Sequence, residues 1–135
     1  MLPNISPILD TEFHTYWLDN GVLHCKVKQA SPTIDELHES MDKLTALLNY
    51  KRYPVLVDPR NAVALNSKQR EAAAQRMPEV ATAVAMIHNN IFVPLMFKLV
   101  MTINKPAHPM RVFKSKEKAL VWLASYKLEE ATQVS

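Results

Sequence analysis

Apolar and polar residues alternate along the first part of the chain, on both sides of an Asn20-Gly21 dipeptide. Asn-Gly between two such segments predicts a β-hairpin with a two-residue loop, because both residues adopt positive φ angles readily. In that register Asp19 lies opposite Val22. Successive side chains of a strand point to opposite faces, so one face of this hairpin turns to the core and the other is polar. The core face carries Tyr16, Leu18, Leu23, Cys25 and Val27, and the polar face carries Thr15, Trp17, His24, Lys26 and Lys28.

A helical spacing of apolar residues begins after Ser31-Pro32. Thr33 and Glu36 have the spacing of a capping box, in which each side chain bonds the backbone amide of the other residue. The apolar positions that follow predict an amphipathic helix that ends near Asn49. They are Ile34, Leu37, Met41, Leu44 and Leu48.

The second half of the chain alternates between helical and strand-like segments. We expect strands at Tyr53 to Val57, Val80 to Ile87 and Met110 to Phe113, and helices at Ser67 to Met77 and Ile91 to Ile103. The strand from Val80 is apolar on both faces, which is typical of a central strand. Ser115 is expected to cap a last helix whose inner side carries Ala119, Leu120, Trp122, Leu123 and Tyr126, followed by a polar tail from Glu129 to Ser135.

Strands that alternate with helices after a hairpin indicate an α/β fold with a mixed sheet. We expect about five strands, beginning with the antiparallel hairpin, and about four helices packed on the sheet. The 135 residues suit a single domain, with its core at about residues 11–127.

Charge and composition exclude some classes of function. The net charge of +3 is a weak basic bias, and Lys and Arg are not clustered with Gly or aromatic residues, so we expect no nucleic acid partner. Cys25 is the single cysteine, which suits the reducing environment of the cytoplasm. The most apolar stretch, Ile91 to Ile103, contains Lys98 and is shorter than the ~20 residues of a membrane span, so we expect no stable membrane insertion.

Four features of the chain are the opening hairpin, the strand Val55-Leu56-Val57-Asp58, the alanine-rich strand before His88-Asn89-Asn90 and the closing P-M-R-V-F-K-S-K-E-K-A-L-V-W-L. Together they resemble the SpoIIAA-like family of the STAS superfamily. The resemblance covers about Thr11 to Lys127. It implies a mixed sheet covered by helices and no catalytic machinery. Some members are anti-anti-sigma factors switched by phosphorylation of a serine, and others resemble lipid-transfer domains of the CRAL-TRIO kind. Ser67 has the spacing of the switch serine, nine residues after Asp58, although its flanking residues differ from the family's Asp-Ser-Ser-Gly.

Several polar residues follow predicted strands, where α/β sheets commonly bind ligands. Arg60 is a candidate anion ligand oriented by Asp58, and the competing interpretation is a turn in which the two side chains pair. Ser67 is a candidate phosphate acceptor, although Ser67, or Asn66 with Gln69, equally suits a helix cap. His88 and Asn89 follow the next strand and are assigned to the same tentative rim.

Apolar residues surround nearly the whole of the predicted helix from Ile91 to Ile103. A surface helix needs one apolar stripe, so the surplus suits the core, a homodimer face or the wall of a pocket for an apolar ligand. The tentative lining residues are Phe92, Leu95, Met96 and Leu99. Trp17, beside His24 and Lys26, marks a candidate partner surface, or is covered by the N-terminal segment.

The five histidines are scattered, Gly21 is the only glycine, and no nucleophile with its base can be assembled from the sequence. We therefore expect no metal, no cofactor and no enzymatic activity. Three hypotheses remain: a regulatory domain of bacterial type that binds a protein partner or itself, with a homodimer expected; a carrier of an apolar small molecule; and a phosphorylation switch at Ser67.

Overall fold

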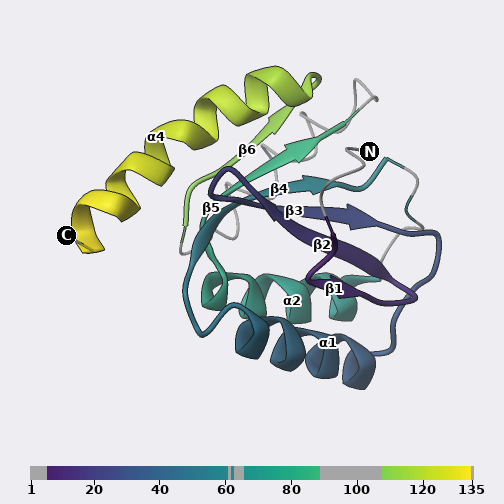
Figure 1. The fold of residues 1–135 in the computed structure, drawn as a ribbon. Coiled ribbons are helices and arrows are strands. Elements are labelled where there is room, and N and C mark those ends of the chain that lie inside the picture. The colour runs from purple at the N-terminus through teal and green to yellow at the C-terminus, as the bar shows by residue number, and fades with distance from the viewer. Residues whose placement is uncertain (1–5, 61, 63–65, 89–107, 135) are drawn as a thin grey trace.

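The structure is a computed structural model that describes residues 6–60, 62, 66–88 and 108–134, with side chains described up to Tyr126. Its single sheet has six strands arranged in chain order (Figure 1). They are β1 (Leu9–Asp10), β2 (His14–Asp19), β3 (Val22–Val27), β4 (Tyr53–Asp58), β5 (Ala81–Ile87) and β6 (Met110–Phe113). The strands β1 to β3 pair antiparallel, and β3 to β6 pair parallel. The predicted mixed α/β sheet is confirmed, with one strand more than the five expected.

The predicted hairpin is confirmed in its register. Asp19 pairs with Val22, and Tyr16 pairs with Cys25. Asn20 and Gly21 have φ angles of 53° and 77°, as a type I′ turn requires.

The additional strand is β1, which the sequence pattern did not predict. It is two residues long, and the Ile8 N–H extends its pairing by donating to the carbonyl oxygen of Tyr16 at 2.8 Å. Thr11 Oγ1 accepts the N–H groups of Phe13 and His14 at 3.1 and 3.0 Å, which turns the chain from β1 into β2. A strand this short has no readable alternation, so its partner β2 determines it.

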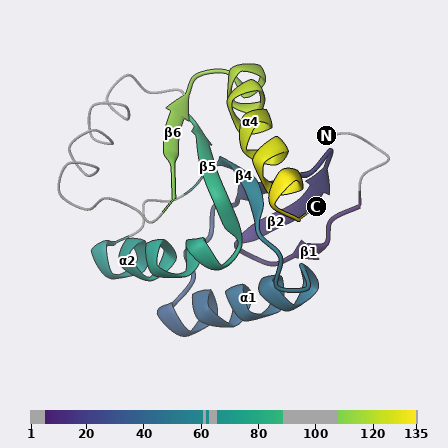
Figure 2. The ribbon, with the colours of Figure 1, turned by 90° about the vertical axis from the view of Figure 1, so that its left-hand side faces the viewer.

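Helices α1 (Ile34–Leu47) and α2 (Ser67–Arg76) cover one side of the sheet, called here the inner face (Figures 1 and 2). Both begin at complete capping boxes, Thr33 with Glu36 and Asn66 with Gln69. A short 3₁₀ helix, η1 (Met77–Glu79), follows α2. The inner core contains Tyr16, Leu23, Cys25, Leu37, Met41, Leu44, Leu48, Val55, Val57, Ala72, Val80, Ala81 and Val84. The predicted core face of the hairpin is therefore confirmed.

Helix α4 (Lys116–Val134) packs on the opposite side, the outer face (Figure 2). Its predicted inner residues Ala119 and Leu123 are fully buried in a second core with Val22, Leu56, Ala83, Ala85 and Ile87. Ser115 Oγ accepts the N–H of Lys118 at 3.1 Å, which is the expected cap. The predicted tail from Glu129 was wrong, because α4 continues to Val134. Ala, Glu and Gln in this segment are good helix formers, and residues 116–135 contain no Gly or Pro to end the helix.

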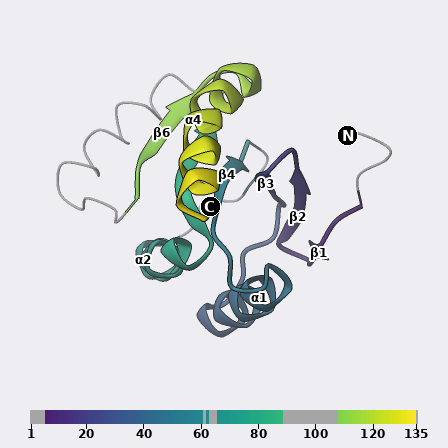
Figure 3. The ribbon, with the colours of Figure 1, turned by 60° about the vertical axis from the view of Figure 1, so that its left-hand side comes forward.

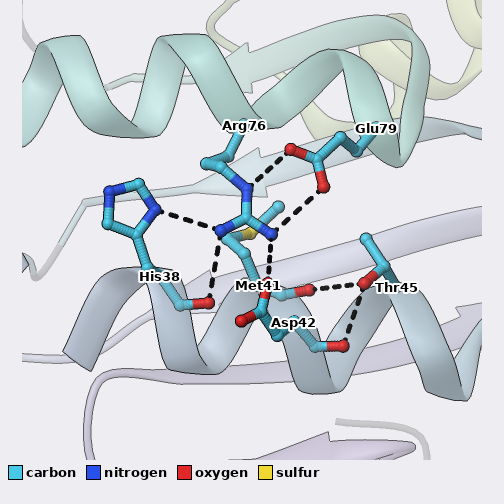
Figure 4. Close-up of polar contacts among 6 residues, drawn as sticks. All are labelled: His38, Met41, Asp42, Thr45, Arg76 and Glu79. Carbon is cyan, nitrogen blue, oxygen red and sulfur yellow. Dashed lines mark hydrogen bonds and ion pairs between the residues drawn. The ribbon is translucent and has the colours of Figure 1, made fainter. Parts of the chain in front are cut away.

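A guanidinium joins the two inner helices (Figure 4). Arg76 Nε donates to Glu79 Oε2 at 2.6 Å, Nη2 donates to Asp42 Oδ1 at 2.6 Å and to Glu79 Oε1 at 3.1 Å, and Nη1 donates to His38 Nδ1 at 3.0 Å. Nη1 also lies 3.4 Å from the His38 carbonyl oxygen. Since residues 38 and 42 belong to α1, this cluster fixes α2 against α1.

Candidate binding surface on the outer face of the sheet

The outer face of the sheet is only partly covered by the described helices. Helix α4 packs over β4, β5 and β6, whereas β1, β2 and most of β3 lie beside it (Figure 3). We call the outer side of these three strands, together with the adjacent end of β4, the open face. Alternation places on it the polar face predicted for the hairpin: Thr15, Trp17, His24, Lys26 and Lys28.

The pairing of the strands arranges this face in two rows. Trp17 pairs with His24, and His24 pairs with Leu56 of β4, which lies under α4. In the next row Thr15 pairs with Lys26, and Lys26 pairs with Asp58 at the end of β4. An aromatic row therefore lies beside a charged row.

Trp17 and His24 form the aromatic row. Their ring centroids are 5.0 Å apart and the rings are nearly parallel, at 15°. His24 is only 3% exposed, although it belongs to the polar face of the hairpin. Burial lowers the pKa of His24, the nearby Lys116 ammonium lowers it further, and Asp19 opposes both effects. His24 therefore supports the partly exposed indole of Trp17.

Asp58 and Arg60 pair with one another at the end of the charged row. Arg60 Nε donates to Asp58 Oδ1 and Nη2 donates to Oδ2, each at 2.9 Å, and the Arg60 N–H also reaches Oδ1 at 3.2 Å. The side-chain hydrogen bonds from Arg60 are the main reason why the pKa of Asp58 is lowered, with a smaller contribution from Lys26. The two side chains therefore pair in the turn, and the role of Arg60 as an anion ligand stays a prediction.

Asp10 and Lys28 close the other end of the charged row. Lys28 Nζ donates to Asp10 Oδ1 and to the Thr11 carbonyl oxygen, both at 2.7 Å, and Thr15 Oγ1 donates to Asp10 Oδ1 at 2.8 Å. These contacts lower the pKa of Asp10, with the bond from Lys28 as the largest cause. The ends of the row are thus fixed by local pairs.

The start of α2 is tied to the neighbouring loop. Asn66 Oδ1 accepts the Gln69 N–H at 2.8 Å, so Asn66, and not Ser67, is the cap. Gln69 Nε2 also donates to Ser31 Oγ and to the Pro32 carbonyl oxygen, at 2.8 and 2.7 Å. Ser67 is exposed in the first turn, and its phosphorylation stays a prediction.

Of the other residues of the predicted rim, His88 follows β5, whose end lies beside the end of β4 because Val57 pairs with Met86. His88 is buried, and its N–H donates to the Phe113 carbonyl oxygen at 2.9 Å, which extends the pairing of β5 with β6. Asn89 and the proposed lining residues Phe92, Leu95, Met96 and Leu99 lie outside the described residues, as does the whole predicted helix from Ile91 to Ile103.

Two features of the outer face were not predicted. Lys116, at the start of α4, lies close enough to His24 to lower its pKa. Arg111 of β6 lies over the rings of Phe113 and Trp122, with its Cζ 5.1 and 5.8 Å from their centroids. No local signal could have found the approach of Lys116 to His24 or of Arg111 to Trp122, because each joins a strand to a helix that follows it. The contact of Arg111 with Phe113 lies within β6.

The described residues contain no group of three His, Cys, Asp or Glu side chains placed to hold a metal ion. Cys25 is buried, and burial raises the pKa of its thiol to about 12. None of the described helices is long and apolar enough to cross a membrane.

Comparison with known proteins identifies the fold and the family. No curated protein matches the chain. A crystal structure of an uncharacterized protein from the DUF3478 family of Shewanella loihica PV-4, with a SpoIIAA-like fold, is similar with a TM-score of 0.59 and 13% identity, over 85% of this chain and 98% of that one. This likeness shows the SpoIIAA-like fold, and membership of the STAS superfamily stays a prediction. Residues 16–127 match the family described as a domain of unknown function, DUF7793, and the chain belongs to that family.

Proposed function

We propose that this protein is a non-enzymatic regulatory domain of the cytoplasm that acts by binding another protein, or a second copy of itself, through the open face. The observation that carries the proposal is the Trp17–His24 stack. It lies between charged side chains on the part of the sheet beside α4, which packs mainly over β4, β5 and β6. A partly exposed tryptophan beside basic residues is typical of an interface.

The polar groups around the stack support binding more than chemistry. Both oxygens of Asp58 accept hydrogen bonds from Arg60, and the lowered pKa makes this carboxylate a weak base. Burial and Lys116 lower the pKa of His24, and Trp17 covers one face of its ring. The fixed pairs at the ends of the charged row give the surface a defined shape before any partner arrives, which reduces the entropic cost of binding.

Site-specific photo-crosslinking in the cells that produce the protein tests this proposal. A photoreactive phenylalanine replaces Thr15 or Lys26 on the open face, and in matched controls it replaces Tyr50 or Val121, which are exposed elsewhere. We expect one defined adduct, with another protein or with the chain itself, from positions 15 and 26 and none from the controls. Equal adducts from all four positions, or no adduct from the open face, would overturn the proposal.

A further inference from the structure

One end of the open face, with the adjoining start of α4, carries positive charge that no ion pair uses. Asp10 is paired with Lys28 at 2.7 Å, and Asp58 is paired with Arg60 at 2.9 Å. Lys26 and Lys116 form no ion pair with another described residue. Two ammonium groups therefore remain available at the end of the face where β4 stops and α4 begins.

These two lysines flank the aromatic stack from different elements. Lys26 follows His24 in β3 by two residues and so points to the same face. Lys116 is the first residue of α4, and its charge lowers the pKa of His24. Glu117, its neighbour, accepts a hydrogen bond from Ser115 Oγ at 3.1 Å. The two lysines thus come from two parts of the fold and lie near His24, which stacks on the indole of Trp17.

The remaining carboxylate of the face lies at the other end. Asp19 stands next to the hairpin loop, two residues beyond Trp17, and its charge raises the pKa of His24 against the effect of Lys116. The face is therefore polarised along β2 and β3. A partner that matches it carries negative charge at the Lys26 and Lys116 end and an apolar group over Trp17.

We propose that the open face binds an acidic segment of a protein partner, with carboxylates against Lys26 and Lys116 and an apolar side chain on the indole of Trp17. This inference rests on the proposed function and adds the chemistry of the partner. Charge complementarity selects an acidic segment, and the stacked indole selects a segment that also contains an apolar residue.

The test uses the full chain and three short fluorescein-labelled peptides that contain phenylalanines and, respectively, glutamates, glutamines or lysines. Fluorescence anisotropy gives the Kd, and ¹⁵N-labelled protein locates the binding. We expect the glutamate peptide to bind most tightly and to shift the amide resonances of β2 and β3. Its affinity is expected to fall as NaCl is added. The lysine peptide is expected not to bind.

Charge variants make the test specific. Lys26→Glu combined with Lys116→Glu is expected to raise the Kd of the glutamate peptide on the order of tenfold. Lys26→Gln combined with Lys116→Gln is expected to raise it by less. Lys43→Glu and Lys51→Glu, which change exposed lysines away from the open face, are expected to change Kd by less than about twofold. Thermal unfolding confirms that each variant is folded.

The outcomes separate this inference from the proposed function. Two results would overturn the proposal of an acidic segment and leave the binding function in place. One is equal binding of all three peptides at the open face, and the other is no peptide binding together with a crosslinked partner from positions 15 and 26. Tight binding to phosphatidylserine vesicles in place of the peptide would assign the face to a membrane surface. Nuclear Overhauser contacts from Trp17 to residues 1–5 of the free protein would assign it to the chain itself, and either result overturns the proposal.

Discussion

Replacing Arg76 by methionine is expected to loosen the packing of α1 against α2. The side chain of Arg76 is 16% exposed, and its guanidinium contacts two carboxylates and His38. Methionine keeps most of the apolar length of the arginine stem and removes all of its hydrogen-bond donors. The substitution therefore isolates the polar contribution of the cluster.

The expected loss follows from the exposure of each partner. Asp42 and Glu79 are 72% and 44% exposed, so water can replace the guanidinium, and each ion pair contributes about 0.2–1 kcal/mol. The bond to His38 Nδ1 is partly buried and contributes about 0.5–1.5 kcal/mol. Together these contacts amount to about 1–3 kcal/mol of unfolding free energy. Roughly 4 °C per kcal/mol then gives a fall in Tm of about 4–12 °C.

Urea unfolding followed by circular dichroism measures this change. Arg60→Met is the matched control, because Arg60 also forms a two-point ion pair, but with a carboxylate two residues away in the same exposed turn. We expect the control to lose less than about 0.5 kcal/mol. Arg76→Lys is expected to lie between the wild type and Arg76→Met, because an ammonium cannot reach all partners at once. An equal loss for Arg76→Met and Arg60→Met would refute the view that Arg76 joins the two helices.

Three further predictions concern stability. Burial lowers the pKa of His14 from 6.5 to about 4, so as the pH falls the unfolded chain takes up a proton before the folded chain does. The contribution of neutral His14 to the unfolding free energy is fully present above pH 6.5, and about 2–3 kcal/mol of it is lost as the pH drops to 4. His14→Phe should flatten this part of the pH profile of stability, and an unchanged slope would count against the prediction. Gln69→Ala removes half of a capping box and both hydrogen bonds to the loop before α1, so it is expected to lower the unfolding free energy in urea by about 1–2 kcal/mol. Ser67→Ala is expected to lower it by less, and equal losses would contradict the role of Gln69. Tyr50 is exposed with a φ angle of 60°, so Tyr50→Gly is expected to raise the unfolding free energy by up to about 1 kcal/mol, and a loss would show that the conformation is not strained.

The elements that the sequence predicted correctly are those with local causes. The Asn20-Gly21 turn fixes the register of β2 and β3, and the Thr33 and Glu36 side chains fix the start of α1. Each depends on residues within a few positions of one another, whose geometry is the same in any fold. The miss at β1 has a nonlocal cause, because β2 offers it an edge. The helical end of α4 has a local cause, the helix propensity of its residues, which the predicted polar tail did not take into account. The sequence left Ser67 and Asn66 open as caps of α2, and the structure has Asn66.

The sequence by itself determined the hairpin, the helix starts and the two-faced character of the strands, because hydrogen bonding and side-chain alternation act over short distances along the chain. It also placed Trp17, His24 and Lys26 on one face of the hairpin. Only the tertiary structure decided that α4 leaves this face open, that Asp58 lies beside Lys26, and that Lys116 comes close to His24. These relations depend on parallel pairing and helix packing between distant segments, and no local pattern encodes which segments will meet.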